Sequence, residues 1–336
     1  GLMPNGSGLM GHRSSTQSGI IIPKPGSNTQ YFIFTVDAFA GSNTIRYNIV
    51  DMNLNSNNGD IITTKKNLPM PYALAAPTAF AERIIAIPKS GSVGYWLVAH
   101  LAQETGTTGT FVVWDITCNS TNDGISEVLF NGQRQSIGST CTSSIYASEL
   151  GYMKISPNGK KIGLANVSTG FELFDFDASS GLVSNPLFLG GVPGLNSYCY
   201  GCEFSPTSNI FFVCLLGASS KIYPLNICAG SNTAIAASSY TLLGSNLGNR
   251  GPMQLGIDGK IYVTRSSTEL SVISNPTIVG VGCNFVDIAI SLAPKANGSS
   301  LPNFIGSYFL QQPTQTPYTY TISNCSTVSF SAAPNV

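Results

Sequence analysis

The sequence predicts an all-β protein, a β-propeller of four-stranded blades with six or seven blades in the complete ring. Apolar runs of five to eight residues, rich in Ile, Val, Phe and Tyr, alternate with clusters of Gly, Asn, Ser and Pro. Such runs are typical of strands separated by turns, and helical periodicity is nearly absent. Related phrases also recur about every 50 residues, which is typical of propeller blades.

The repeat is clearest in three phrases, ISPNGKKIGLA (155–165), FSPTSNIFFV (204–213) and LGIDGKIYVT (255–264). Asn158, Ser208 and Asp258 are spaced 50 residues apart in both intervals. The dipeptides that begin at Asn158 and Asp258, Asn-Gly and Asp-Gly, favour two-residue type I′ hairpins, in which both turn residues have positive φ. Each phrase is therefore predicted to join two neighbouring strands of one blade.

The propeller is predicted to span residues 1–310. Its blades are expected at about 18–70, 78–136, 149–190, 196–245 and 250–292, and 301–309 (LPNFIGSYF) is interpreted as the inner strand of a further, partial blade. Residues 311–336 are interpreted as a linker followed by the start of a PKD-like or immunoglobulin-like domain, or by edge strands. Because a closed ring usually joins its first and last strands in one blade, strands are expected to be missing at the N-terminal side.

Charge is scarce in this chain, with 16 basic and 16 acidic residues among 336 and a formal net charge of zero. There is no basic field for a phosphate backbone, so nucleic-acid binding is not expected. No run approaches the ~18 apolar residues of a membrane span, so direct membrane insertion is not expected either. A polar but uncharged surface suits one module of a larger extracellular protein. The expected location is therefore extracellular or at the cell surface.

Eight cysteines are present, and Cys199 and Cys202 form a CxxC motif. A spacing of three along a strand places two residues on opposite faces, so a metal site is not expected there. Cys202 with Cys214, and Cys118 with Cys141, are weak candidates for disulfides. Such bonds would indicate an oxidising compartment.

Candidate catalytic groups are few. A Ser–His–Asp triad would have to use His12 or His100, the two histidines of the chain, and an ordinary packed or exposed histidine is the preferred interpretation. Glu172, Asp175 and Asp177 could form the paired carboxylates of a glycosidase or lyase. The preferred interpretation is that FDFD (174–177) ends an outward strand near solvent, with Asp175 and Asp177 fixing the turn DASSG (177–181).

The segment DMNLNSNNGD (51–60) comes nearest to a calcium loop, because it carries several oxygen ligands, but it lacks the bidentate glutamate of an EF-hand. An Asn-rich hairpin loop is preferred. The sequence therefore predicts no catalytic residue, no cofactor-binding residue, no metal ligand and no cofactor.

Several phrases resemble, in order, the N-terminal propeller region of large Bacteroidetes surface proteins. They include MPNGSGLMGHRSSTQSGIIIPKPGSNTQYFIFTVD, IRYNIVDM, GYWLVAH, GYMKISPNGKKIGLA, FELFDFDASSGLVSN, YGCEFSPTSNIFFV, LGIDGKIYVTRS, LSVISNP and LPNFIGSYF. The resemblance covers about 1–310. It implies a propeller followed by PKD or other immunoglobulin-like repeats and a type IX secretion or gliding-motility sorting domain, with no established catalytic residues. The expected upstream strands and the sorting domain are not present in this sequence.

The sequence is compatible with two functions of different classes. The preferred hypothesis is a non-catalytic extracellular module for adhesion that contacts protein chains or domains of a surface assembly, or glycans. Its aromatic contacts would be Tyr95, Trp96, Tyr198, Tyr200, Tyr318 and Tyr320. The alternative is a propeller enzyme, a polysaccharide hydrolase or lyase or a lactonase, with its site at a channel mouth. The alternative requires charged groups that converge at the channel, which would be conspicuous in so uncharged a chain.

Overall fold

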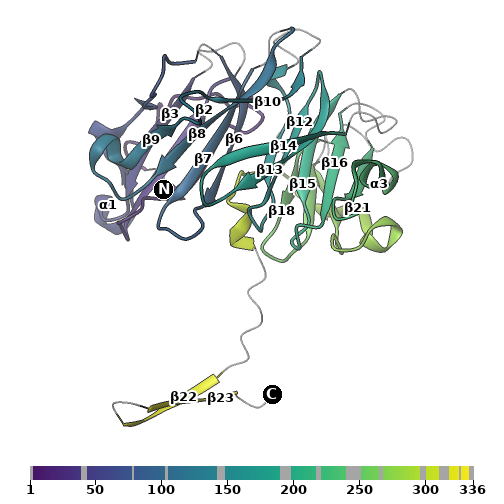
Figure 1. Ribbon diagram of the computed structural model, residues 1–336. Helices are drawn as coiled ribbons and strands as arrows, with labels where there is room; N and C mark the ends of the chain where they lie inside the picture. The colour runs from purple at the N-terminus through teal and green to yellow at the C-terminus, as the bar shows by residue number, and fades with distance from the viewer. Residues whose placement is uncertain are drawn as a thin grey trace.

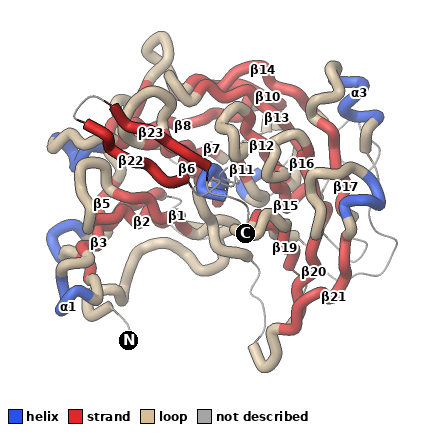
Figure 2. The backbone as a smooth tube through the Cα atoms, turned by 90° about the horizontal axis from the view of Figure 1, so that it is seen from below, coloured by secondary structure: helices blue, strands red, loops and turns tan. Residues whose placement is uncertain are grey.

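The computed structural model describes residues 3–38, 44–77, 79–102, 105–141, 148–189, 198–216, 221–239, 251–264, 268–295, 300–309, 318–324 and 327–332. Within these residues, five small antiparallel sheets follow one another along the chain as the blades of a propeller (Figures 1 and 2). The predicted all-β propeller class is therefore confirmed.

Blade 1 has the strand order β1-β2-β3-β4, and β5 also pairs with β3. Its strands are β1 (Gly19–Pro23), β2 (Gln30–Val36), β3 (Ile45–Asp51), β4 (Asp60–Ile61) and β5 (Leu68–Pro69). Blade 2 has the order β10-β8-β7-β6, and β9 also pairs with β8. Its strands are β6 (Phe80–Pro88), β7 (Tyr95–Leu101), β8 (Thr108–Ile116), β9 (Ile125–Val128) and β10 (Gln135–Thr140).

Blades 3, 4 and 5 are simple meanders in which each strand pairs with the next. Blade 3 consists of β11 (Met153–Ile155), β12 (Lys161–Asn166), β13 (Gly170–Asp177) and β14 (Leu182–Phe188). Blade 4 consists, in its described residues, of β15 (Cys199–Phe204), β16 (Ile210–Leu215) and β17 (Ile222–Asn226). Blade 5 consists of β18 (Met253–Leu255), β19 (Ile261–Thr264), β20 (Glu269–Ile273) and β21 (Phe285–Ser291).

The other elements are short. They are α1 (Leu54–Asn57), η1 (Thr63–Lys65), η2 (Thr121–Gly124), α3 (Asn232–Ala237), η3 (Gly280–Cys283), η4 (Gly306–Phe309) and a separate hairpin of β22 (Tyr318–Asn324) and β23 (Thr327–Ala332). No helix in the described part of the chain combines the length and the apolar character needed to cross a membrane.

The predicted number of six or seven blades is wrong, because the described residues form five. The segment expected to begin a further blade, residues 301–309, contains no strand and ends in η4. Pro302 has no N–H to contribute to a ladder. Asn303 contacts β6 through its side-chain amide, which donates to the carbonyl of Ile84 at 2.7 Å.

The repeated turns differ from the predicted type I′ geometry. In each phrase an N–H bonds the carbonyl three residues earlier: Gly159 to Ser156 at 2.8 Å, Ser208 to Ser205 at 2.9 Å and Gly259 to Gly256 at 3.0 Å. The fourth residue of each turn has positive φ, +73° at Gly159, +62° at Ser208 and +75° at Gly259. Asn158 and Asp258 do not have positive φ. The structural repeat therefore aligns Gly159, Ser208 and Gly259, and not Asn158, Ser208 and Asp258.

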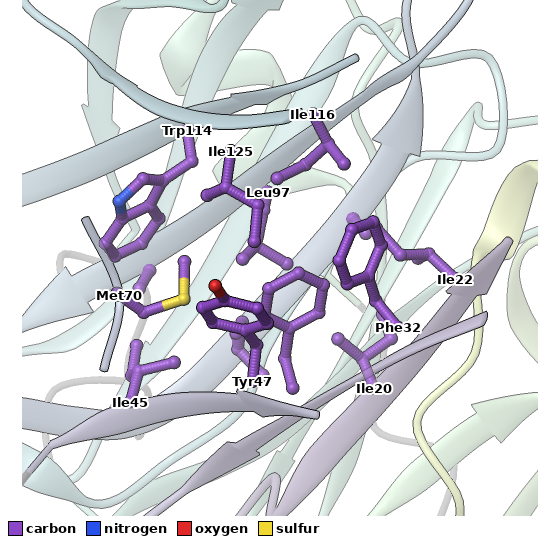
Figure 3. Packing of buried hydrophobic residues seen from close by; sticks show 14 of the residues in the cluster. Ile20, Ile22, Phe32, Ile45, Tyr47, Met70, Leu97, Trp114, Ile116 and Ile125 are labelled. Atoms are coloured by element: carbon purple, nitrogen blue, oxygen red, sulfur yellow. The ribbon is translucent and has the colours of Figure 1, made fainter. Parts of the chain in front are cut away.

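Apolar clusters fill the spaces between consecutive blades. Figure 3 shows the cluster between blades 1 and 2, in which Phe32 and Tyr47 face Leu97 and Trp114. The Trp114 indole N–H donates to the carbonyl of Pro71 at 2.9 Å, so this large ring is buried without an unsatisfied donor. Because each inner blade is covered on both faces, its strands are continuous apolar runs.

The two proposed disulfides are not formed, since the seven cysteines in the described residues are thiols. Cys202 stands opposite Val213 in the ladder, and Cys214 stands opposite Gly201. Cys202 belongs to the apolar cluster between blades 3 and 4, whereas Cys214 belongs to the cluster between blades 4 and 5. Cys118 is exposed and Cys141 is buried beside Ser148.

The CxxC motif also departs from simple alternation. A register shift between Cys199 and Gly201 places Cys199 and Cys202 in the same apolar cluster, although a regular strand would place them on opposite faces. Burial raises the pKa of the Cys202 thiol. These cysteines act as small apolar residues in the packing.

We expect Gly163→Ala to destabilise the protein by about 1–3 kcal/mol, because the added methyl group would overlap the buried ring of Phe211 between blades 3 and 4. Chemical denaturation measures the change. Gly306→Ala is the matched control, since its new methyl group would meet only the carbonyl of Ile155 at an ordinary 3.4 Å. Equal stability of the two variants would contradict tight packing at Gly163.

Candidate functional site

The first strands of the blades surround the channel. Strand β6 contacts β1 and β11, and β15 contacts β11 and β18. The amide of Gln17 ties two of these strands together, because its Oε1 accepts from the N–H of Met153 at 2.9 Å and its Nε2 donates to the carbonyl of Ile84 at 3.3 Å. The channel wall is thus held by side-chain amides as well as by the apolar clusters.

Five ionisable side chains converge beside the channel, and we call them the ionic cluster: Glu82, Arg83, His100, Glu149 and Glu172. Two lie on β6, one on β7 and one on β13, and Glu149 precedes β11. Their exposed fractions are only 0–3%. Ionisable groups are rarely buried unless they are paired or hydrogen-bonded, so a group of five marks this region as unusual.

Arg83 is the cation at the centre of the ionic cluster. Its guanidinium donates to the carbonyl of Ala165 at 2.6 Å and to the carbonyl of Ser148. Its Nε–H has no hydrogen-bond partner among the described residues. The neighbouring Glu82 carboxylate accepts from the N–H and the hydroxyl of Thr16, at 2.8 and 3.1 Å.

The environment alters the protonation of the ionic cluster. Burial lowers the pKa of Arg83 to about 10, although the surrounding carboxylates oppose this, so the group stays cationic at neutral pH. Burial, reinforced by Glu82 and opposed by Arg83, raises the pKa of Glu149 to about 7. Burial also raises the pKa of Glu172. Glu149 can therefore exchange a proton near neutral pH, as a general acid or base must.

A buried ion pair and its hydrogen-bond partners join the first strands of blades 3, 4 and 5. The Lys154 ammonium lies 3.1 Å from the Glu203 carboxylate and donates to the side chain of Gln254 at 2.7 Å. The same carboxylate accepts from the N–H of Leu255 at 3.0 Å. Both charges are thus satisfied by partners on neighbouring blades.

A groove of about 1060 Å³ lies between blade 1 and blade 5, and we call it the seam groove. Its walls come from β1 and β2 on one side and from β18 to β20 on the other, and residues 300–305 and 308 complete it. Its apolar lining includes Ile21, Ile33, Ile257, Tyr262, Leu270 and Phe304. Gln17 and Gln254 also line it, so the groove borders the polar channel.

The three carboxylates considered for a paired site are separated. Glu172 belongs to the ionic cluster, whereas Asp175 pairs with Lys161. Asp177 accepts from the hydroxyl of Ser180 at 2.7 Å and fixes the turn that follows β13. The preferred turn interpretation is correct for Asp177 and wrong for Asp175, which contacts Lys161 and Asn185 instead of the turn.

The two histidines have unrelated environments. His12 is exposed, and its Nδ1 lies 2.6 Å from the hydroxyl of Ser14. His100 is buried with its ring edge-on to Phe111 at 4.9 Å, and burial, reinforced by Arg83, lowers its pKa well below the usual value. The described residues contain no Ser–His–Asp triad around either histidine.

The 51–60 loop does not gather its carboxylates at one point. Asp51 accepts from the amide of Gln30 at 3.0 Å, and Asp60 accepts from the amide of Asn5 at 2.7 Å. No set of three or more His, Cys, Asp or Glu residues in the described part is placed to hold a metal ion.

The aromatic candidates do not form one surface. Trp96 is buried and donates to the carbonyl of Ala178 at 2.8 Å. The Tyr95 hydroxyl meets that of Tyr308 at 2.7 Å, and the half-buried Tyr200 ring packs edge-on against the buried ring of Tyr152. Tyr198 is exposed, and the side chains of Tyr318 and Tyr320 lie outside the described part of the structure.

Glu82, Arg83 and Glu149 were not predicted from the sequence. Glu82 and Arg83 interrupt the apolar strand FAERIIAIP (80–88), and Glu149 follows a serine before GYMKI (151–155). In a chain with 10% charged residues, adjacent charges inside an apolar run are a signal that could have identified β6.

No family model matches the chain, and no curated protein matches it. Solved structures do match. A periplasmic gluconolactonase from Pseudomonas aeruginosa is 12% identical, over 78% of this chain and 68% of that one, with a TM-score of 0.43. Sqt1 from Chaetomium thermophilum is 11% identical, over 84% and 64%, with a TM-score of 0.46. A 6-phosphogluconolactonase-like protein from Bacteroides fragilis is 10% identical, over 82% and 84%, with a TM-score of 0.43. At these identities the similarity extends to the propeller fold alone.

The predicted non-catalytic adhesion module is not supported by these findings: proteins named as gluconolactonases are among the matching structures, although at these identities they share only the propeller fold with this chain. The structure does bring charged groups together in the ionic cluster, but their exposed fractions of 0–3% place them in the interior and not at a channel mouth.

The raised pKa of Glu149 gives a pH dependence of stability. Between its ordinary pKa of 4.5 and its folded value of about 7, the unfolded chain loses this proton before the folded protein does. The contribution of Glu149 to the free energy of unfolding is thus complete below about pH 4.5, and it is lost as the pH rises to about 7. The free energy of unfolding of the parent should therefore fall by about 1–3 kcal/mol more over this pH range than that of Glu149→Gln, which has no such proton to lose. Urea unfolding across this range measures it, and parallel profiles for parent and variant would contradict a raised pKa.

The Lys154–Glu203 pair gives a second prediction. Lys154→Met should cost about 3–5 kcal/mol in the free energy of unfolding, because it leaves a buried carboxylate without its cation. Adding Glu203→Gln should restore much of this loss, since the amide oxygen can still accept from Leu255. Thermal unfolding of the two single variants and the double variant measures the coupling. Additive losses would show that the two groups do not interact.

Proposed function

We propose that this protein is a hydrolase of small lactones, with its reactive groups in the ionic cluster. The observation that carries the proposal is the burial of Glu149 beside Arg83, which supplies a proton-transfer group with a pKa of about 7 next to a permanent cation. A general base and an electrostatic stabiliser are the two groups that attack of water on an ester carbonyl requires.

Burial favours a small substrate over a polysaccharide. Arg83 and Glu149 have no exposed surface, and Glu82 and Glu172 are 3% and 2% exposed. A polymer needs an open cleft in which several sugar units lie on the surface, whereas a small cyclic ester can be enclosed. Enclosure also strengthens the interaction of a cation with a developing negative charge.

Each residue has a defined role in the proposed reaction. Glu149, ionised, takes a proton from water as the water oxygen bonds the lactone carbonyl carbon. The Arg83 Nε–H, which has no partner among the described residues, donates to the oxyanion that forms. The intermediate then breaks its bond to the ring oxygen, which receives the proton from Glu149. The product is the open-chain hydroxy acid, and the enzyme returns to its starting state.

The test is hydrolysis of a panel of aldonolactones and simple δ- and γ-lactones by the full chain, followed by base consumption at constant pH. We expect a rate above the buffer reaction that rises through an apparent pKa near 7, matching ionisation of Glu149. Glu149→Gln should lower kcat at least about 100-fold, the contribution of a positioned acid or base.

The matched control is Glu269→Gln, the same substitution at a partly exposed position on β20 of blade 5. This variant should retain the parent rate. Circular dichroism should show that both variants are folded. Absence of lactone hydrolysis, or an active Glu149→Gln variant, would overturn the proposal.

A further inference from the structure

The seam groove lies between two sheet faces that are apolar but share no buried cluster. In blade 1, Ile21 and Ile33 stand opposite each other in the β1–β2 ladder, and both line the groove. On the other side, Tyr262 and Leu270 line it from blade 5. In the described part of the chain, the four buried apolar clusters join consecutive blades from blade 1 to blade 5, and none joins blade 5 to blade 1. The groove therefore separates two apolar walls.

The groove also has the size and the composition of a small-molecule site. Its volume of about 1060 Å³ is close to the upper end of the range for ligand pockets, about 300–1,000 Å³. Ile21, Ile257 and Phe304 line it and are 58%, 88% and 50% exposed. Large apolar side chains that gather at one exposed place are typical of binding sites.

The lining of the groove is uncharged. None of the described residues that line it is an Asp, Glu, Lys, Arg or His, and no member of the ionic cluster is among them. A charged ligand would lose its hydration in this groove without gaining an ion partner. The lining therefore selects an uncharged ligand and excludes fatty-acid anions and phosphates.

Two side-chain amides supply a polar end to the groove. Gln17 and Asn303 both line it, and both donate to the carbonyl of Ile84, at 3.3 and 2.7 Å. The Gln17 Oε1 already accepts from the N–H of Met153. The Asn303 Oδ1 is buried and has no hydrogen-bond partner among the described residues. A buried acceptor without a donor is costly, so a ligand that donates a hydrogen bond here would be favoured.

We propose that the seam groove binds an uncharged amphiphile, a long-chain primary alcohol, with its hydroxyl toward the amide end of the groove. The hydroxyl donates to the Asn303 Oδ1, and the aliphatic chain packs between Ile33 of blade 1 and Leu270 of blade 5. Binding at this site does not use the ionic cluster and is independent of lactone hydrolysis.

The first test measures displacement of a neutral dye, N-phenylnaphthylamine, from the full chain by decanol, decanoate and methyl decyl ether. The dye should bind saturably, and decanol should displace it. Decanoate should bind at least about 10-fold more weakly than decanol, because its charge has no partner in the groove. The ether should bind about 3–10-fold more weakly than decanol, because it has no donor for Asn303.

Matched variants locate the binding site. Ile21→Glu places a charge in the groove and should weaken decanol binding at least about 10-fold. Ile278→Glu is the control, since Ile278 is similarly exposed, at 50%, but does not line the groove, and it should bind as the parent does. Asn303→Ala should bind decanol and its methyl ether equally. Circular dichroism checks that each variant is folded.

Three results would overturn the proposal. The first is the absence of saturable binding by the parent, as expected if another segment of the chain or a second copy covers the groove. The second is equal affinity of the parent for decanol and either of the other two compounds, which would remove the uncharged hydroxyl as the recognised group. The third is equal binding by Ile21→Glu and Ile278→Glu, which would place the site elsewhere.

Discussion

The structure depends on one constraint, which is that each small sheet must bury both of its faces. A three- to five-stranded sheet with apolar residues on both faces cannot do this alone, and packing against two neighbours solves the problem. The four apolar clusters between consecutive blades are the result, and rings such as Trp114 and Phe211 are fully buried in them. The position of the channel and the order of its inner strands follow from this packing.

The same constraint explains why the ionic cluster is costly. A charge taken from water into such an interior loses several kcal/mol of solvation unless partners replace the water. Arg83 recovers part of this through two backbone carbonyls, and Glu82 through Thr16. A chain with so few charged residues nevertheless buries five ionisable groups in one place. Departures of this kind from ordinary packing rules are expected at functional sites, where stability is exchanged for reactivity.

Much of the fold could be predicted from the sequence, because its signals are local. The apolar runs and the repeated phrases indicate strands and a repeat, and five sheets do follow one another along the described chain. The turn type could not be read from Asn158-Gly159, because a positive φ at the glycine alone also fits a longer turn. Residues 301–309 have strand-like composition, but the interaction of Asn303 with β6 depends on chain more than 200 residues away.

The ionic cluster could not be predicted because it is entirely a product of long-range packing. The contact between Arg83 and Ala165 joins residues 82 positions apart, and no short motif encodes it. The sequence groups Glu172 with Asp175 and Asp177 because all three lie on one strand, β13. In a propeller, however, a buried side chain also meets the neighbouring blade. The packing of blade 2 against blade 3 therefore decides that Glu172 interacts with Arg83.

Gln17 is where the groove, the channel and the ionic cluster meet. Its side chain lines the seam groove and spans β6 and β11, and its N–H bonds the carbonyl of Glu82 at 2.9 Å. A substitution at Gln17 would therefore disturb packing at the seam and the position of Glu82 together. Glu149, in contrast, belongs to the ionic cluster and does not line the groove. Loss of lactone hydrolysis with intact packing at the seam would therefore separate the chemistry of the cluster from the packing between blade 1 and blade 5.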